Sequence, residues 1–188
     1  MSPEWLAAAS SLATLFVISL TAYAAVRQMS HLRSGNQVAA LLPLTEKYQT
    51  PEIQESLNYV IGKLNSDLRD PAVRAGVVAR PSAGPASQAK AVFNFYESVG
   101  ALVCARALDL QLVLRYFTLP SEMWELGADF IALTRSNRGD EVFENFEALV
   151  AMQLAYEKRQ GTSLYPRGLP RVALPSVHAG DVTVVVNK

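Results

Sequence analysis

The sequence predicts an all-α protein with a single N-terminal transmembrane helix, an irregular helical bundle and an extended, proline-rich C-terminal tail. Three observations support this fold class. Residues 5–26 carry no charge, residues 44–160 repeat apolar side chains at three- and four-residue spacing, and three prolines interrupt residues 161–188. The expected organisation is an extracytoplasmic head (1–4), the transmembrane helix (5–26), a juxtamembrane helix or linker (27–43), a cytoplasmic bundle (44–160) and the tail (161–188).

The uncharged stretch, WLAAASSLATLFVISLTAYAAV, is long enough to cross a bilayer. With a helical rise of about 1.5 Å per residue it extends about 33 Å, against a hydrocarbon core of about 30 Å. Phe16 and Ile18 lie in its apolar centre, whereas Trp5 and Tyr23 are expected near the two interfaces, where amphipathic rings are favoured. We therefore expect a single-pass anchor in the lipid bilayer.

Two other interpretations of this stretch remain open. A signal peptide has a positive n-region and a shorter apolar core, but Glu4 is the only charged side chain before the stretch. The triplet Ala22-Tyr23-Ala24 nevertheless resembles a small-residue cleavage site. A buried helix of a soluble protein rarely contains so long an uncharged run. The anchor is therefore the favoured interpretation.

The flanks of the stretch predict its orientation. Arg27 and Arg33 follow it directly, whereas the head Met1-Ser2-Pro3-Glu4 has no basic side chain. Because basic flanks stay on the cytoplasmic side, we expect the N-terminus outside and the following domain in the cytoplasm.

The charge balance of the bundle argues against nucleic-acid binding. Residues 44–160 carry 12 Lys and Arg against 15 Asp and Glu, a net charge of −3. Nucleic-acid-binding domains usually present a basic patch or stripe. We expect no nucleic-acid partner.

Local start and stop signals divide residues 27–160 into helices. A kink or break is expected near Gly35, and Pro43 is expected to close the first segment because the residue before proline avoids helical geometry. Later helices are expected to be capped at their N-termini by Thr50, Asp70 and Ser87, and a further helix is expected to start at Leu108-Asp109. Further signals delimit helices over residues 120–136 and 141–159, the last ending at Gly161.

Helical periodicity also predicts which side chains face the core. The helix after Thr50 is expected to bury one face, and the helix from Ser87, with its wide apolar face, is expected to lie in the middle of the bundle. The predicted buried faces are Ile53, Leu57, Val60, Ile61 and Leu64, then Val92, Tyr96, Val99 and Val103, and finally Phe143, Phe146, Val150 and Leu154.

The tail differs from the bundle in composition. Pro166, Pro170 and Pro175 exclude a helix and favour an extended path. The run Val182–Val186 is β-prone, so it either adds to a partner's sheet edge or lies along this protein's own surface. A loosely ordered terminus is the simpler alternative.

One polar cluster is a candidate for chemistry. Asn94, Tyr96 and Glu97 lie on or beside the apolar face of the central helix, where a carboxylate must be paired. Glu97 is either one half of a core ion pair or an acid/base in a polar pocket. The available cations are Arg106, Arg115 and Arg135, and the candidate binding residues are Asn94, Tyr96, Glu97, Arg115, Trp124 and Arg135.

Nothing in the sequence predicts a cofactor or a metal. Glu141, Glu144 and Glu147 drift around one side of the last helix, but no histidine occurs between His31 and His178 to complete a dimetal motif. The single cysteine, Cys104, has no nearby base, and neither a phosphate-binding glycine loop nor a Gly-x-Ser-x-Gly elbow is present.

Several of these residues together resemble a bacterial family catalogued only as a domain of unknown function. The resemblance covers about residues 1–160, excludes the tail and implies a membrane-anchored helical domain, here in the bacterial inner membrane, with Asn94, Tyr96 and Glu97 as its signature. It implies no mechanism. The residues that carry it are Tyr48-Gln49-Thr50-Pro51-Glu52, Asn94-Phe95-Tyr96-Glu97, Gly100, Asp109, Trp124 and Phe146-Glu147.

Three functions compete at this point. The first is a membrane-tethered interaction subunit that binds a protein partner through the bundle and tail. The second is a membrane-surface enzyme with Glu97 as acid or base. The third is an accessory helix of a larger membrane complex, in which Ala9 and Ala13, or Ser10 and Thr14, allow close helix packing. We favour the first and third together.

Overall fold

The computed structural model of the chain is helical in every regular element that it describes. It describes residues 3–79, 84–161, 163–165, 168 and 170, without the side chains of residues 3–9, 30, 31, 33 and 34. This confirms the all-α class for these residues. The elements are α1 (Pro3–Tyr48), α2 (Pro51–Gly62), α3 (Leu64–Asp67), α4 (Pro71–Val78), α5 (Pro85–Cys104), α6 (Leu110–Tyr116), α7 (Pro120–Arg138) and α8 (Glu144–Gln160).

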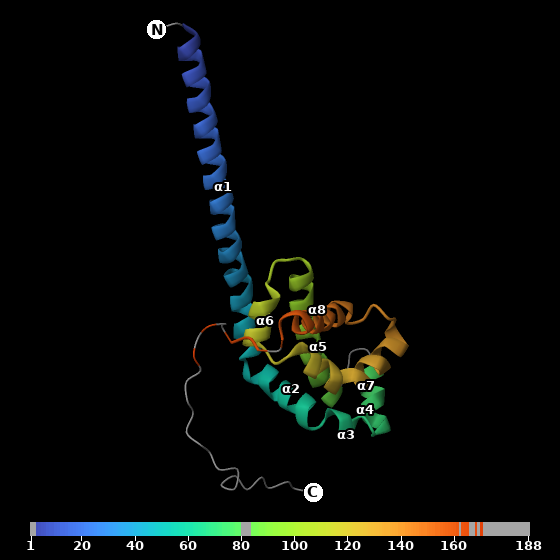
Figure 1. Ribbon diagram of the computed structural model, residues 1–188. Coiled ribbons are helices and arrows are strands. Elements are labelled where there is room, and N and C mark those ends of the chain that lie inside the picture. The colour runs from blue at the N-terminus through green and yellow to red at the C-terminus, as the bar shows by residue number, and fades with distance from the viewer. Residues whose placement is uncertain (1–2, 80–83, 162, 166–167, 169, 171–188) are drawn as a thin grey trace.

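Helix α1 extends far from the other helices, which pack together around its C-terminal end (Figure 1). Its segment Ser10–Met29 is long and apolar enough to cross a membrane, and none of it is buried by the rest of the chain. Membrane anchors and signal sequences both have segments of this kind. At the other end of α1, Leu41 is buried and Leu44 and Tyr48 pack against the core.

The predicted interruptions of α1 are wrong. The helix continues through Gly35 and also through Pro43, which lies inside it. Proline removes one N–H from the helix, and the freed carbonyl belongs to Ala39, an exposed residue that water can reach. The side chains just after Pro43 are the ones that pack into the core, so tertiary contacts offset the local cost of the proline.

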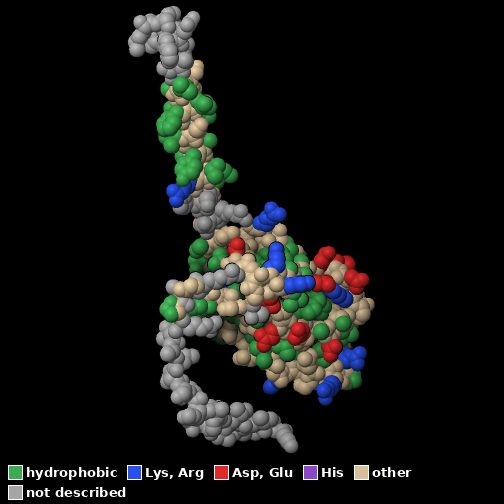
Figure 2. Space-filling model, viewed as in Figure 1, with side chains coloured by type: hydrophobic (Ala, Val, Ile, Leu, Met, Phe, Trp, Pro, Cys, Tyr) green, Lys and Arg blue, Asp and Glu red, His purple; other side chains and the backbone are tan. Residues whose placement is uncertain are grey.

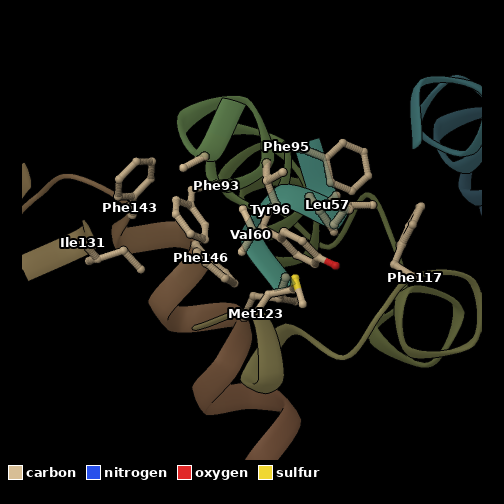
Figure 3. Packing of buried hydrophobic residues seen from close by; sticks show 14 of the residues in the cluster. Leu57, Val60, Phe93, Phe95, Tyr96, Phe117, Met123, Ile131, Phe143 and Phe146 are labelled. Atoms are coloured by element: carbon tan, nitrogen blue, oxygen red, sulfur yellow. The ribbon is translucent and has the colours of Figure 1, made fainter. Parts of the chain in front are cut away.

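Helix α5 occupies the middle of the bundle and contacts α2, α4, α7 and α8, as predicted. Its predicted face of Val92, Tyr96, Val99 and Val103 is buried. Aromatic rings from α5, α7 and α8 meet there, and Tyr96 stacks on Phe146 with 5.1 Å between ring centroids (Figure 3). These rings form one continuous core with apolar side chains from α2.

Two of the three predicted N-caps are confirmed. The side chains of Thr50 and Asp70 accept hydrogen bonds from the first turns of α2 and α4, and Asp109, which the sequence marked only as a helix start, caps α6 in the same way. The third predicted cap, Ser87, is wrong because α5 begins earlier, at Pro85, directly after Gly84. The Ser87 hydroxyl instead donates back to the Gly84 carbonyl at 2.7 Å.

Two residues of the predicted core are exposed. Ile61 is 54% exposed and Leu154 is 52% exposed. Residues at four-residue spacing advance about 40° per step around a helix, so a strict four-residue stripe drifts away from the core. In α8 the fully buried positions belong instead to Leu149 and to Gln153, the residue directly before Leu154.

The predictions for the C-terminal tail fall largely outside the described residues. This applies to Pro166, to Pro175 and to the valine run 182–186. Within the part that is described, the Tyr165 hydroxyl donates to the Pro170 carbonyl at 3.0 Å, and Gly161 ends α8 with a positive φ of 80°.

Candidate functional site

The carboxylate of Glu97 joins α5 to the start of α8. Its Oε1 accepts from the Asn145 side chain at 2.7 Å and from the Asn145 backbone N–H at 3.3 Å. Its Oε2 accepts from the Phe146 backbone N–H at 2.8 Å. Backbone N–H groups in the first turn of a helix have no partner within that helix, and the helix dipole favours a negative charge there. Glu97 therefore caps α8 from a neighbouring helix.

Helix α8 needs this external cap because its own N-cap residue supplies none. That residue is Phe143, whose side chain makes no capping hydrogen bond and packs in the buried core. Its backbone is left-handed, with φ 63° and ψ 30°, which is unfavourable for a bulky residue. The chain therefore enters α8 through a strained residue held by the aromatic core and by the Glu97 hydrogen bonds.

Gly100, one turn after Glu97, lets α5 and α8 approach closely. A Cβ atom at this position would lie 2.1 Å from the Asn145 carbonyl oxygen and 2.6 Å from its carbon. No side chain fits in that space. Gly100 thus supports the capping role of Glu97, because the backbone N–H groups of α8 reach the carboxylate only when α5 and α8 lie this close together.

The predicted arginine partners of Glu97 are used elsewhere. Arg135 bonds to Glu147 at 2.6 Å, donates to the Val142 carbonyl at 2.9 Å and lies over the Trp124 ring at 5.4 Å. The predicted binding residues Arg135 and Trp124 are therefore brought together beside the first turns of α8.

The other two predicted cations also lie apart from Glu97. Arg115 donates to the Leu164 carbonyl at 3.3 Å, which ties α6 to the start of the tail. Arg106 is exposed in the turn between α5 and α6. The prediction of a core ion pair is wrong, and backbone N–H groups take the place of the cation.

The three residues of the polar cluster do not share a pocket. Asn94 is exposed, whereas Tyr96 is fully buried and its hydroxyl donates to the Thr118 carbonyl at 3.0 Å. Burial, followed by the neighbouring Tyr48, raises the pKa of Tyr96, so its phenol stays protonated. The Tyr48 hydroxyl lies 2.7 Å from Thr118 Oγ1. Tyr96 thus belongs to a network that fixes α1 and α5 to the segment between α6 and α7.

This geometry bears on what Glu97 can do chemically. Both of its oxygens already accept hydrogen bonds from α8, and three cavities in the described part of the chain are lined by other residues. Among the described residues, no three His, Cys, Asp or Glu side chains are grouped closely enough to hold a metal ion. The arrangement at Glu97 is that of a structural cap.

Sequence reasoning missed a polar hollow of about 670 Å³ between α3, α4 and α7. Two arginines, Arg69 and Arg74, contribute cationic side chains to it, and Asp129 contributes an acidic one. The only signal was that these arginines flank the Asp70-Pro71 helix start, which was interpreted solely as a cap. The lining residues are Asn65, Leu68, Arg69, Arg74, Asp129, Ala132, Leu133 and Ser136.

A second missed feature is a groove of about 370 Å³ where α1 meets the bundle. One wall is a face of α1, and the other is the turn that contains Arg106 and Ala107. The sequence placed Arg106 only as a possible partner of Glu97. The lining residues are Met29, Leu32, Asn36, Gln37, Ala40, Arg106 and Ala107.

The predicted anchor residues lie on the projecting part of α1. Phe16, Ile18, Tyr23 and Arg27 are all exposed. The side chains of Trp5 and Arg33 lie outside the described ones. Three hydroxyl side chains in the apolar stretch bond within the helix, each donating to the carbonyl four residues earlier at 2.8 Å: Thr14, Ser19 and Thr21.

Comparison with known proteins gives one match. No curated protein and no solved structure matches the chain. The model of the family described as a domain of unknown function (DUF4760) matches residues 6–153, which include α1 from Leu6 onward, the Glu97 cap and most of α8. This match confirms the resemblance inferred from the sequence. The chain belongs to the DUF4760 family.

Proposed function

We propose that this protein is a membrane-anchored helical subunit that binds a protein partner in a complex at the cytoplasmic face of the bacterial inner membrane. One observation carries the proposal: the helical segment Ser10–Met29 is long and apolar enough to cross a membrane and is entirely unburied, on a helix that continues into the core of the bundle. Exposed apolar surface of this extent on a soluble protein marks an interaction with a membrane or another protein.

The hydroxyl groups of the apolar stretch support a lipid environment. In a bilayer each polar group needs an internal partner, because no water is available in the hydrocarbon region. Thr14, Ser19 and Thr21 each donate to a carbonyl of their own helix. The stretch therefore carries little unsatisfied polarity into the lipid.

The continuity of α1 favours a retained anchor over a cleaved signal. Leu41 and Tyr48, near the end of the same helix, pack against the core. The orientation is inferred from the flanking sequence, with Arg27 and Arg33 after the uncharged residues 5–26 and no basic residue in the head Met1-Ser2-Pro3-Glu4. With this orientation the N-terminus would lie outside and the bundle in the cytoplasm.

The hollow at Arg69 and Arg74 supports a role in binding a partner. Both arginines are exposed, and within the described part of the chain neither forms an ion pair. An arginine fork recognises carboxylates through two parallel hydrogen bonds. An acidic segment of a protein partner suits this hollow, with the tail of this protein as a second contact.

Co-purification from detergent-solubilised membranes tests the proposal. The full chain, a version without residues 162–188 and the double variant Arg69→Gln/Arg74→Gln are compared at equal expression. We expect the full chain to retain one or more partner proteins in stoichiometric amount and the variants to lose them. Extraction of the full chain by alkaline carbonate without detergent would contradict the anchor, and a lone monodisperse monomer in every case would contradict the partner.

A membrane-surface enzyme that uses Glu97 was the alternative suggested by the sequence. The hydrogen bonds of Glu97 give it no support, because both oxygens already accept from α8 and Glu97 lines none of the three cavities described above.

A further inference from the structure

The groove between α1 and the α5–α6 turn begins where the apolar stretch ends. Met29 is both the last residue of that stretch and the first residue of the groove. Leu32, Asn36 and Ala40 follow on the same face of α1, at helical spacing, so the groove extends about 16 Å along the helix. Figure 2 shows basic side chains where α1 meets the bundle.

The position of this groove places it at the bilayer surface if the stretch spans the membrane as proposed above. The polar headgroup layer on each side of a bilayer is about 5–8 Å thick. Leu32 lies about 4.5 Å beyond Met29 along the helix axis, within that layer. The part of the groove around Leu32 therefore faces headgroups, while Met29 faces the part of the acyl chains next to the headgroups.

The chemistry of the lining suits an anion with an apolar attachment. Among the described residues of the lining, Arg106 is the only charged one and none is acidic. Asn36 and Gln37 add amide groups that donate hydrogen bonds, and Met29 and Leu32 add exposed apolar surface. The volume, about 370 Å³, falls in the range of about 300–1,000 Å³ typical of small-molecule sites.

The backbone at Arg106 gives an independent reason to assign it a role. Helix α5 ends in a Schellman motif: the Ala107 N–H donates to the Leu102 carbonyl at 2.9 Å and the Arg106 N–H donates to the Val103 carbonyl at 2.9 Å. The residue in the left-handed position of this motif is usually glycine. Here it is Arg106, with φ 59°. Strain of this kind is found where a side chain is needed for function.

We propose that this groove binds the headgroup of an anionic phospholipid, with the Arg106 guanidinium on the phosphate and with Met29 and Leu32 against the adjoining acyl chain. The inference rests on the proposed membrane anchor. A guanidinium matches the geometry of a phosphate through paired hydrogen bonds, and the strained backbone fixes the point from which the side chain extends. Lipid bound here would hold the bundle against the membrane surface.

Titration of the full chain in neutral detergent micelles tests the site. Phosphatidylglycerol, phosphatidylcholine and inorganic phosphate are added separately, and the midpoint of thermal unfolding is measured. The variants are Arg106→Gly, which suits the left-handed backbone and therefore folds, and Arg106→Lys, which keeps the charge. Lys63→Gln is the control, because it removes one exposed positive charge between α2 and α3, outside the groove.

We expect phosphatidylglycerol, and neither phosphatidylcholine nor phosphate, to raise the midpoint of the parent by several degrees. Arg106→Gly should lose this response, Arg106→Lys should retain part of it, and Lys63→Gln should respond like the parent. An equal response in Arg106→Gly would overturn the inference, since the lipid would then bind elsewhere. A response to phosphate as large as that to phosphatidylglycerol would also overturn it, by making the site one for a free anion.

Flotation with lipid vesicles separates failure of this inference from failure of the proposed anchor. If the full chain does not float with vesicles, the anchor is wrong and the lipid site is wrong with it. If the chain floats but Arg106→Gly keeps the full response to phosphatidylglycerol, only the lipid site is wrong.

Discussion

Replacing Gly100 with alanine is expected to destabilise the bundle, although alanine is the better helix former. In the interior of a helix such as α5 this change normally stabilises by about 1 kcal/mol. Here the added Cβ would lie 2.1 Å from the Asn145 carbonyl oxygen, whereas such contacts are essentially never shorter than 3.0 Å. The start of α8 must therefore move away from α5 by about 1 Å, as the difference between these two distances requires.

The size of the effect follows from what this movement disrupts. Hydrogen bonds of 2.7–3.3 Å from Asn145 and Phe146 to Glu97 would lengthen toward or beyond 3.5 Å. Hydrogen bonds to a charged group contribute about 1.5–3 kcal/mol each, and overpacking costs about 1–3 kcal/mol. With the gain in helix propensity subtracted, we expect Gly100→Ala to lower the free energy of unfolding by about 3–5 kcal/mol.

Urea unfolding of the full chain in neutral detergent, followed by circular dichroism, measures this difference. Gly62→Ala is the matched control, because a Cβ at Gly62 meets nothing within 4 Å and its stability should stay equal or rise slightly. If Gly100→Ala were as stable as Gly62→Ala, the close approach of α5 to α8 would be absent in solution and the capping role of Glu97 would lose its basis.

Three further predictions concern single polar groups. Glu97→Gln should lower the free energy of unfolding by about 2 kcal/mol, measured by urea unfolding, because an amide presents only one acceptor to the α8 donors; an unchanged midpoint would contradict the cap. Tyr96→Phe should cost about 1–2 kcal/mol in the same assay, since the buried Thr118 carbonyl loses its donor. Tyr59→Phe should leave stability equal or raise it by about 1 kcal/mol, because its buried hydroxyl has no hydrogen-bond partner among the described residues. Burial, aided by the Asp67 charge, also raises the pKa of Tyr59 from 10.0 to about 12, so the folded state favours the protonated phenol. The free energy of unfolding of the parent is therefore unaffected by this group below pH 10 and falls as the pH rises toward 12. Urea midpoints across this window should fall more steeply for the parent than for Tyr59→Phe, and identical slopes would refute the assignment.

The parts of the fold that depend on local sequence were predictable. Thr50 and Asp70 cap their helices as predicted, because the interaction involves only the next two or three residues. The predicted breaks at Gly35 and Pro43 failed because a local preference was outweighed by packing of the residues that follow, which no window of sequence contains.

The site was less predictable because its contacts are distant in sequence. Glu97 was correctly singled out as a carboxylate that needs partners, but those partners are 48 and 49 residues away, and two of the three donors are backbone N–H groups. Every residue except proline has a backbone N–H, so the sequence cannot single out a backbone donor, whereas it does show each arginine. The sequence therefore favoured the wrong partner. The groove at Arg106 also depends on how α1 and α5 meet, which only the fold determines.

Because α1 continues through Gly35 and Pro43, one helix would connect the bilayer to the bundle if the chain is anchored as proposed. From Met29 to Tyr48 the helix rises about 28 Å, and Tyr48 is tied to Thr118 at its end. A transmembrane helix tilted by about 20° would therefore carry the bundle sideways by about 10 Å. Changes in membrane thickness that alter the tilt would thus reposition the bundle relative to any neighbour in the same membrane.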